Sequence, residues 1–152
     1  MNASPGKRVF LLGYGNPGRR DDGLGPALAS AIEALNLPEV AVEAAYQLNI
    51  EDAATLAAYD RALFVDASIQ SAAPYELRKA TAAPAIAFTS HSVSPDSVLA
   101  ICEEHFNPAP EAWVLAIRGY DFELGEGLSP QAGQNLEHAL AFARTLLDEW
   151  RT

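Results

Sequence analysis

Gly13-Tyr14-Gly15-Asn16-Pro17-Gly18-Arg19-Arg20-Asp21-Asp22-Gly23-Leu24-Gly25 is the segment of this 152-residue chain that decides the fold. It follows a strand predicted at residues 7–13 and precedes a helix predicted from Leu24 to Asn36, where apolar residues recur at helical spacing. In open parallel sheets, such strand-to-helix turns lie at the carboxyl ends of the strands, which is also where ligands bind. The segment therefore predicts an α/β fold with a site that follows the first strand.

The rest of the sequence alternates predicted strands with predicted helices. We expect strands at residues 40–46, 62–66, 75–79, 85–88 and 113–117, and helices at 51–59, from Ser94 onward and from Ser129 to about Trp150. The last two helices each begin with Ser-Pro, a capping residue followed by a proline in the first turn. The pattern predicts one domain over residues 1–152, a three-layer α/β/α sandwich around a mostly parallel, twisted sheet of about five strands.

Composition limits the possible partners. The chain has 10 basic and 20 acidic residues, a formal net charge of −10, so a nucleic-acid partner is not expected. No apolar run is long enough to span a membrane, and the run after Lys7 and Arg8 is too short for a signal peptide. The lone Cys102 forbids an internal disulfide. We expect a cytoplasmic monomer with no membrane partner.

Three side chains follow predicted strands and form the candidate site. Asp22 closes the glycine-rich segment, Asp66 ends the apolar run 62–65, and His91 follows residues 85–90. Two carboxylates and one imidazole at one edge of a sheet suit a divalent transition metal. Because three side chains fill only part of a coordination shell, another group must complete it.

Each of these residues also has a structural explanation. Asp22 or Asp21 could cap the following helix, Asp66 could accept hydrogen bonds from a loop backbone, and His91 could lie on the surface. Gly13-x-Gly15-x-x-Gly18 also matches the dinucleotide fingerprint. However, the two aspartates would repel a pyrophosphate at the helix N-terminus, so a nucleotide site is disfavoured.

Several motifs occur in a fixed order along the chain: Gly13-x-Gly15-Asn16, Asp21-Asp22-Gly23-x-Gly25, Val65-Asp66-Ala67, Ser90-His91 and Gly127-Leu128-Ser129-Pro130. Together they strongly resemble the nickel–iron hydrogenase maturation proteases, over nearly the whole chain. The chain departs from some members, which have Asp-Gly-Gly-Thr after the second strand, because residues 45–49 read Ala-Tyr-Gln-Leu-Asn here. The resemblance therefore does not indicate which hydrogenase would be processed.

The resemblance implies a function for the candidate site. Members remove a short C-terminal peptide from the hydrogenase large-subunit precursor after nickel has been inserted. The residues matching Asp22, Asp66 and His91 form the metal site and the catalytic site, and the nickel belongs to the precursor. We therefore expect nickel to arrive with the substrate and no tightly bound metal of the protein's own.

Two alternatives stay open at this stage. Peptidyl-tRNA hydrolases have a similar opening motif and a related fold, but they need a His-Asn pair shortly downstream, and this chain has no His before residue 91. The second alternative is a chaperone that recognises the nickel-loaded precursor without cutting it. His105 and His138 are expected to be structural or exposed to solvent, and Cys102 to be a buried apolar residue.

Overall fold

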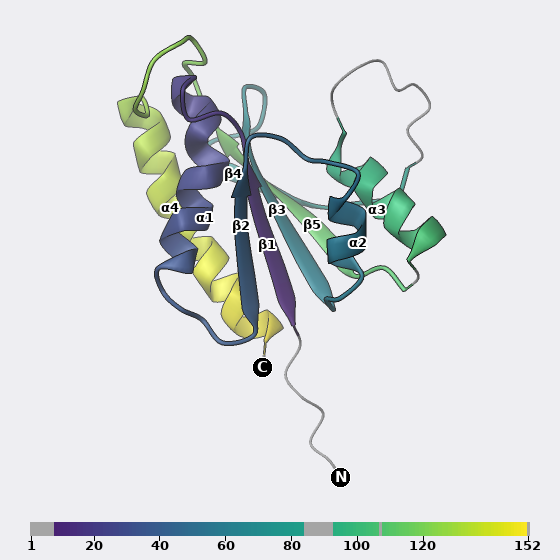
Figure 1. Cartoon of the computed structure of the whole chain (residues 1–152). Coiled ribbons are helices and arrows are strands. Elements are labelled where there is room, and N and C mark those ends of the chain that lie inside the picture. Colours follow the sequence, from purple (N-terminus) through teal and green to yellow (C-terminus); the bar gives the residue numbers. More distant parts are fainter. Residues whose placement is uncertain (1–7, 84–92, 107, 152) are drawn as a thin grey trace.

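The computed structural model describes residues 8–83, 93–106 and 108–151. Its centre is a five-stranded sheet in the order β2-β1-β3-β5-β4 (Figure 1). The four strands β2, β1, β3 and β5 are parallel, and β4 pairs antiparallel with β5 at one edge. The strands are β1 (Val9–Tyr14), β2 (Val40–Ala45), β3 (Arg61–Ser68), β4 (Tyr75–Lys79) and β5 (Glu111–Arg118).

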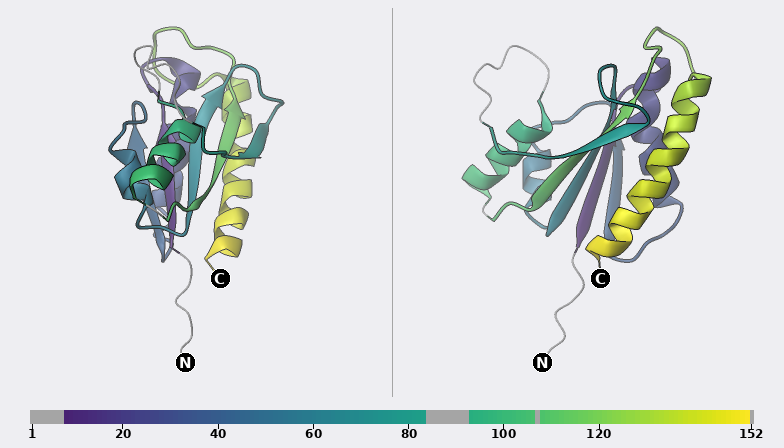
Figure 2. Two further views of the ribbon diagram at one scale, coloured as in Figure 1. Left: turned by 90° about the vertical axis from the view of Figure 1, so that its right-hand side faces the viewer. Right: turned by 180° about the vertical axis from the view of Figure 1, so that it is seen from behind.

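Helices cover both faces of the sheet. Helices α1 (Leu24–Glu33) and α4 (Pro130–Trp150) lie on one face, and α2 (Asp52–Leu56) and α3 (Pro95–His105) lie on the other (Figures 1 and 2). A short 3-10 helix, η1 (Arg20–Gly23), connects the β1 turn to α1. The predicted three-layer α/β/α architecture with a mostly parallel sheet is confirmed. No helix in the described part of the chain is long and apolar enough to cross a bilayer.

The central strands are buried on both faces. In β1, Val9 and Leu11 belong to the core beneath α1 and α4, whereas Phe10 and Leu12 belong to the core beneath α2 and α3. Each of these side chains is at most 2% exposed. Burying a side chain of this size contributes roughly 1.5–3 kcal/mol. This two-sided burial is why the strands read as continuous apolar runs rather than as alternating patterns.

The predicted element boundaries differ from the observed ones at several ends. Helix α1 ends at Glu33 rather than Asn36, and Asn36 has a positive φ of 50°, which a continuing helix does not allow. Helix α2 is shorter than the predicted 51–59, and β3 extends beyond the predicted 62–66. The strand predicted at 85–88 lies outside the described residues. Ser94 and Ser129 cap α3 and α4 through their side chains, as predicted.

Candidate active site

The candidate site lies at the carboxyl ends of β1 and β3. Gly13 of β1 pairs with Val65 of β3, so Tyr14 and Asp66, one residue further along each strand, are neighbours at this edge. Side chains alternate along a strand, so both follow Leu12 and Phe64 toward the α2/α3 face. The register of two buried strands therefore brings a phenol and a carboxylate together.

The turn after β1 is built around Gly15 and Asp22. Gly15 has φ of +145°, a conformation that favours glycine, and its Cα faces the Asp22 carbonyl so closely that no side chain could fit. The next amide, Asn16 N–H, donates a hydrogen bond of 2.7 Å to Asp22 Oδ2. Asn16 Oδ1 in turn accepts from Gly18 N–H at 2.9 Å. These contacts fold the segment back on itself and hold the Asp22 carboxylate beside the end of β1.

Close packing of α1 against the sheet brings this turn to the strand ends. A Cβ on Gly25 would lie 2.5 Å from the carbonyl oxygens of both Tyr14 and Val65. A Cβ on Gly13 would collide with the Gly25 carbonyl. Gly13 and Gly25 thus allow the close approach of α1 to the strand ends, which is a structural reason for glycine at both positions.

Asp66 is a perturbed carboxyl group. Its pKa is raised to about 6; burial is the largest cause, and the negative charge of Asp22 acts in the same direction. Hydrogen bonds from the Tyr14 hydroxyl and the Ala67 amide oppose this rise, because they stabilise the ionised form. Asp22 is held beside the end of β1 and Asp66 lies near the end of the neighbouring β3, so both carboxylates lie at the same edge of the sheet. Paired carboxylates with a raised pKa are typical of proton-transfer sites.

Tyr14 belongs to this site, although it is not among the site residues predicted from the sequence. Burial raises the pKa of its phenol well above the usual range, and the adjacent Asp66 carboxylate acts in the same direction. The phenol therefore stays protonated at physiological pH and serves as a hydrogen-bond donor to Asp66. Its position at the end of the first strand is the feature of the sequence that could have predicted a place in the site.

Asp21 has a different role from Asp22. It is fully buried and accepts hydrogen bonds from the amides of Tyr120, Asp121 and Ser129 and from the Ser129 hydroxyl, at 2.7 to 3.0 Å. Burial alone would raise its pKa, but these donors outweigh it and hold the pKa below the usual value. Asp21 therefore anchors the connection between β5 and α4 to η1.

The capping explanation for these aspartates is wrong. Helix α1 has Gly23 as its N-cap, with no side-chain hydrogen bond from Asp21 or Asp22. Asp21 accepts from a distant loop, and Asp22 accepts from the turn after β1. Neither carboxylate therefore caps the N-terminus of α1.

The structure brings Asp22 and Asp66 together, whereas His91 lies outside the described residues. Within residues 8–83, 93–106 and 108–151, no three His, Cys, Asp or Glu side chains form a cluster that could hold a metal. The assignment of His91 as the third ligand stays a prediction. His105 and His138 are exposed, and Cys102 is buried. These three therefore match the roles expected of them.

Several of the solved structures that are similar to this chain are [NiFe] hydrogenase maturation proteases. HycI, a [NiFe] hydrogenase maturation protease from Thermococcus kodakarensis, superposes with a TM-score of 0.73 at 20% identity, covering 95% of each chain. The hydrogenase maturating endopeptidase HybD from E. coli gives 0.75 at 22% identity, covering 93% of each chain. A hydrogenase 2 maturation peptidase from a Thaumarchaeota archaeon gives 0.69 at 20% identity, covering 93% of this chain and 98% of that one.

No protein-family model and no curated protein matches the chain. At about 20% identity, the structural likeness establishes the fold and leaves the activity to be tested. The chain has the fold of the [NiFe] hydrogenase maturation proteases along almost its entire length.

Proposed function

We propose that this protein is an endopeptidase that removes the C-terminal extension of a nickel–iron hydrogenase large-subunit precursor after nickel insertion. In this proposal, the nickel bound to the precursor is the recognition element. The observation that carries the proposal is the Asp22–Asp66 pair, held at the carboxyl ends of β1 and β3 on the maturation-protease fold.

The incomplete ligand set supports a metal that arrives with the substrate. Two neighbouring carboxylates, joined by His91 as the sequence predicts, leave coordination positions for ligands from the precursor. Nickel held in this way would connect metal insertion to cleavage, because a precursor without nickel would lack the group that the carboxylates bind.

The perturbed Asp66 supports a role in proton transfer. A carboxyl group with a pKa of about 6 is mostly ionised at neutral pH and can accept a proton from water. The water oxygen would form a bond to the peptide carbonyl carbon while its proton passes to the carboxylate. As the C–N bond breaks, that proton would pass to the leaving amine. Asp22 is the alternative base, since both carboxylates belong to the site.

The test is to incubate the protein with a large-subunit precursor, with and without nickel, and to measure intact mass. The proposal predicts loss of a C-terminal peptide from the nickel-loaded precursor only. Intact precursor in both reactions, with the cognate substrate from the same genome, would contradict it. Stable binding without cleavage would instead support the chaperone alternative.

The variant Asp66→Asn separates binding from catalysis. It keeps the shape of the side chain and an oxygen that can still contact the metal but cannot accept the proton, so it should bind the nickel-loaded precursor and fail to release the peptide. Asp148→Asn, on α4 beside Arg151, is a matched control that should cleave at the wild-type rate. Normal turnover by Asp66→Asn would exclude the proton-transfer role.

A further inference from the structure

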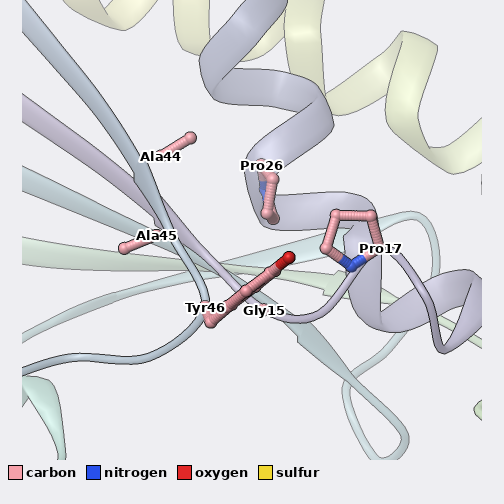
Figure 3. A pocket seen from close by; sticks show the side chains of 6 residues that line it. All are labelled: Gly15, Pro17, Pro26, Ala44, Ala45 and Tyr46. Atoms are coloured by element: carbon pink, nitrogen blue, oxygen red, sulfur yellow. The ribbon is translucent and has the colours of Figure 1, made fainter.

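An apolar pocket lies next to the candidate site, at the end of β2. It has a volume of about 270 Å³. Figure 3 shows the side chain of Tyr46 extending along one side of it toward the two prolines. Its walls come from β2, the β1 turn and the first turn of α1, and they are formed by Gly15, Pro17, Pro26, Ala44, Ala45 and Tyr46.

The size and lining of the pocket define what it can hold. Pockets for whole small molecules generally begin near ~300 Å³, so this one suits a single side chain better than a cofactor. None of the lining side chains is charged, and the nearest carboxylate of the candidate site, Asp22, is negative. An anionic group is therefore disfavoured on grounds of charge, and an uncharged apolar group fits.

Gly15 lies between the pocket and Asp22 of the candidate site. On one side, Gly15 lines the pocket, and its N–H donates to the Ala45 carbonyl at 3.0 Å. On the other side, its backbone lies against Asp22, whose carboxylate accepts from the next amide. A chain that crosses the site can therefore place one side chain in the pocket while its neighbouring backbone lies beside Asp22.

Apolar exposure at the pocket indicates that a partner covers it. Tyr46 is 76% exposed and Ile50, a few residues further along the same loop, is 52% exposed. Ile69, after β3, and Leu124, after β5, are 63% and 73% exposed at the same edge of the sheet. These four side chains follow β2, β3 and β5, and exposed apolar side chains along one edge of a sheet are typical of a surface that receives another chain.

We propose that this pocket binds one apolar side chain of the substrate polypeptide, close to the bond that is cut, and that Ala44 and Tyr46 determine which side chain is accepted. This inference rests on the proposed function and adds a substrate feature to it. Ala44 is exposed at the pocket wall, so its size limits the depth of the pocket. Tyr46 forms one side wall of the pocket, so removing its ring should allow the pocket to accept side chains of more sizes.

The experiment uses a change in the enzyme that is complemented by a change in the substrate. Ala44→Leu fills the pocket and should lower kcat/KM for the nickel-loaded precursor at least about tenfold, through KM, because a pocket of this kind discriminates by single methylene groups. In the precursor, the apolar residues around the cleavage point are then replaced by Ala, one at a time. Only one of these replacements should restore cleavage by the Ala44→Leu enzyme. Tyr46→Ala should reduce the discrimination between large and small residues at that same position.

Controls separate this inference from the proposed function. Ala54→Leu, on α2 and outside the pocket, replaces an alanine that is likewise exposed and should leave KM unchanged. If Ala44→Leu cleaves every precursor as the wild type does, the pocket assignment is wrong while the protease function stands. If the wild type binds the precursor but does not cut it, the proposed protease function is wrong. The pocket is then tested by comparing the affinities of the wild type and of Ala44→Leu for the precursor. A tenfold weaker affinity of Ala44→Leu would then support the pocket, and equal affinity or no binding by either protein would overturn it.

Discussion

At the scale of single residues, Asp66 is a half-buried carboxyl group that destabilises the fold by an amount that depends on pH. Its pKa in the folded protein is raised to about 6 from an ordinary value near 3.8, so the folded state binds the proton more tightly than the unfolded chain does. Stability should therefore rise as the pH falls through 6 toward 4. Well above pH 6, the folded state is destabilised by the full cost of ionising this half-buried carboxyl group.

Asp66→Asn removes that cost and should stabilise the protein at pH 8 by about 2–3 kcal/mol, the equivalent of the pKa difference. The Asn side-chain oxygen can still accept from Tyr14 and Ala67. The advantage should become small near pH 4 and disappear at pH values well below 3.8, where the wild-type carboxyl is protonated in both states. Urea unfolding of both proteins across this range measures it, and a constant difference at all pH values would contradict the prediction.

Tyr14 stabilises the ionised form of Asp66 by donating its hydroxyl hydrogen bond. Tyr14→Phe removes only that oxygen, so the pKa of Asp66 should rise further above 6. The carboxyl carbon of Asp66, followed by NMR through a pH titration, reports the shift directly. Tyr75→Phe is the matched control, because Tyr75 stacks on Phe142 away from the site. An unchanged or lower pKa in Tyr14→Phe would show that the hydrogen bond does not stabilise the ionised carboxylate.

At the scale of elements, the contact between α1 and the strand ends depends on the absence of a side chain at Gly25. Gly25→Ala would place a Cβ 2.5 Å from two backbone carbonyls, so we expect a loss of at least about 2 kcal/mol. The same substitution at Gly133, in α4, meets no atom within 4 Å. Gly133→Ala should stabilise the protein by about 0.5–1 kcal/mol. Thermal unfolding of the two variants should thus shift in opposite directions.

The connection between β5 and α4 depends on Asp21. Asp21→Asn keeps one acceptor oxygen but turns an NH2 group toward buried N–H and O–H donors. We expect a loss of about 2–4 kcal/mol, because charge-assisted bonds disappear and buried donors lose their partner. Asp22→Asn, at the next position, accepts a single amide and should cost far less. Equal unfolding midpoints in urea at pH 7 for the two variants would contradict this assignment.

At the scale of the whole molecule, the sequence predicted what local patterns encode. Apolar runs located the central strands, and the Ser-Pro pairs located the starts of α3 and α4 within one residue. The role of Asp21 could not be predicted, because its partners lie 99 to 108 residues away and meet it only after the sheet has formed. The Tyr14–Asp66 pair likewise depends on the register between β1 and β3, which no local pattern specifies.

The distribution of charge over the molecule argues against tRNA as a substrate. The net charge is −10, and several arginines are engaged by carboxylates: Arg20 by Asp121, Arg61 by Glu111, Arg78 by Asp96 and Arg151 by Asp148. Binding to a phosphate backbone requires free basic groups that displace counterions. We therefore expect no retarded band when tRNA is mixed with the protein up to about 100 µM, the weak end of non-specific affinities at physiological salt. A basic protein of similar size is the positive control in the same gel. Micromolar binding that weakens steeply with salt would favour the peptidyl-tRNA hydrolase alternative, because only that function requires a phosphate-binding surface.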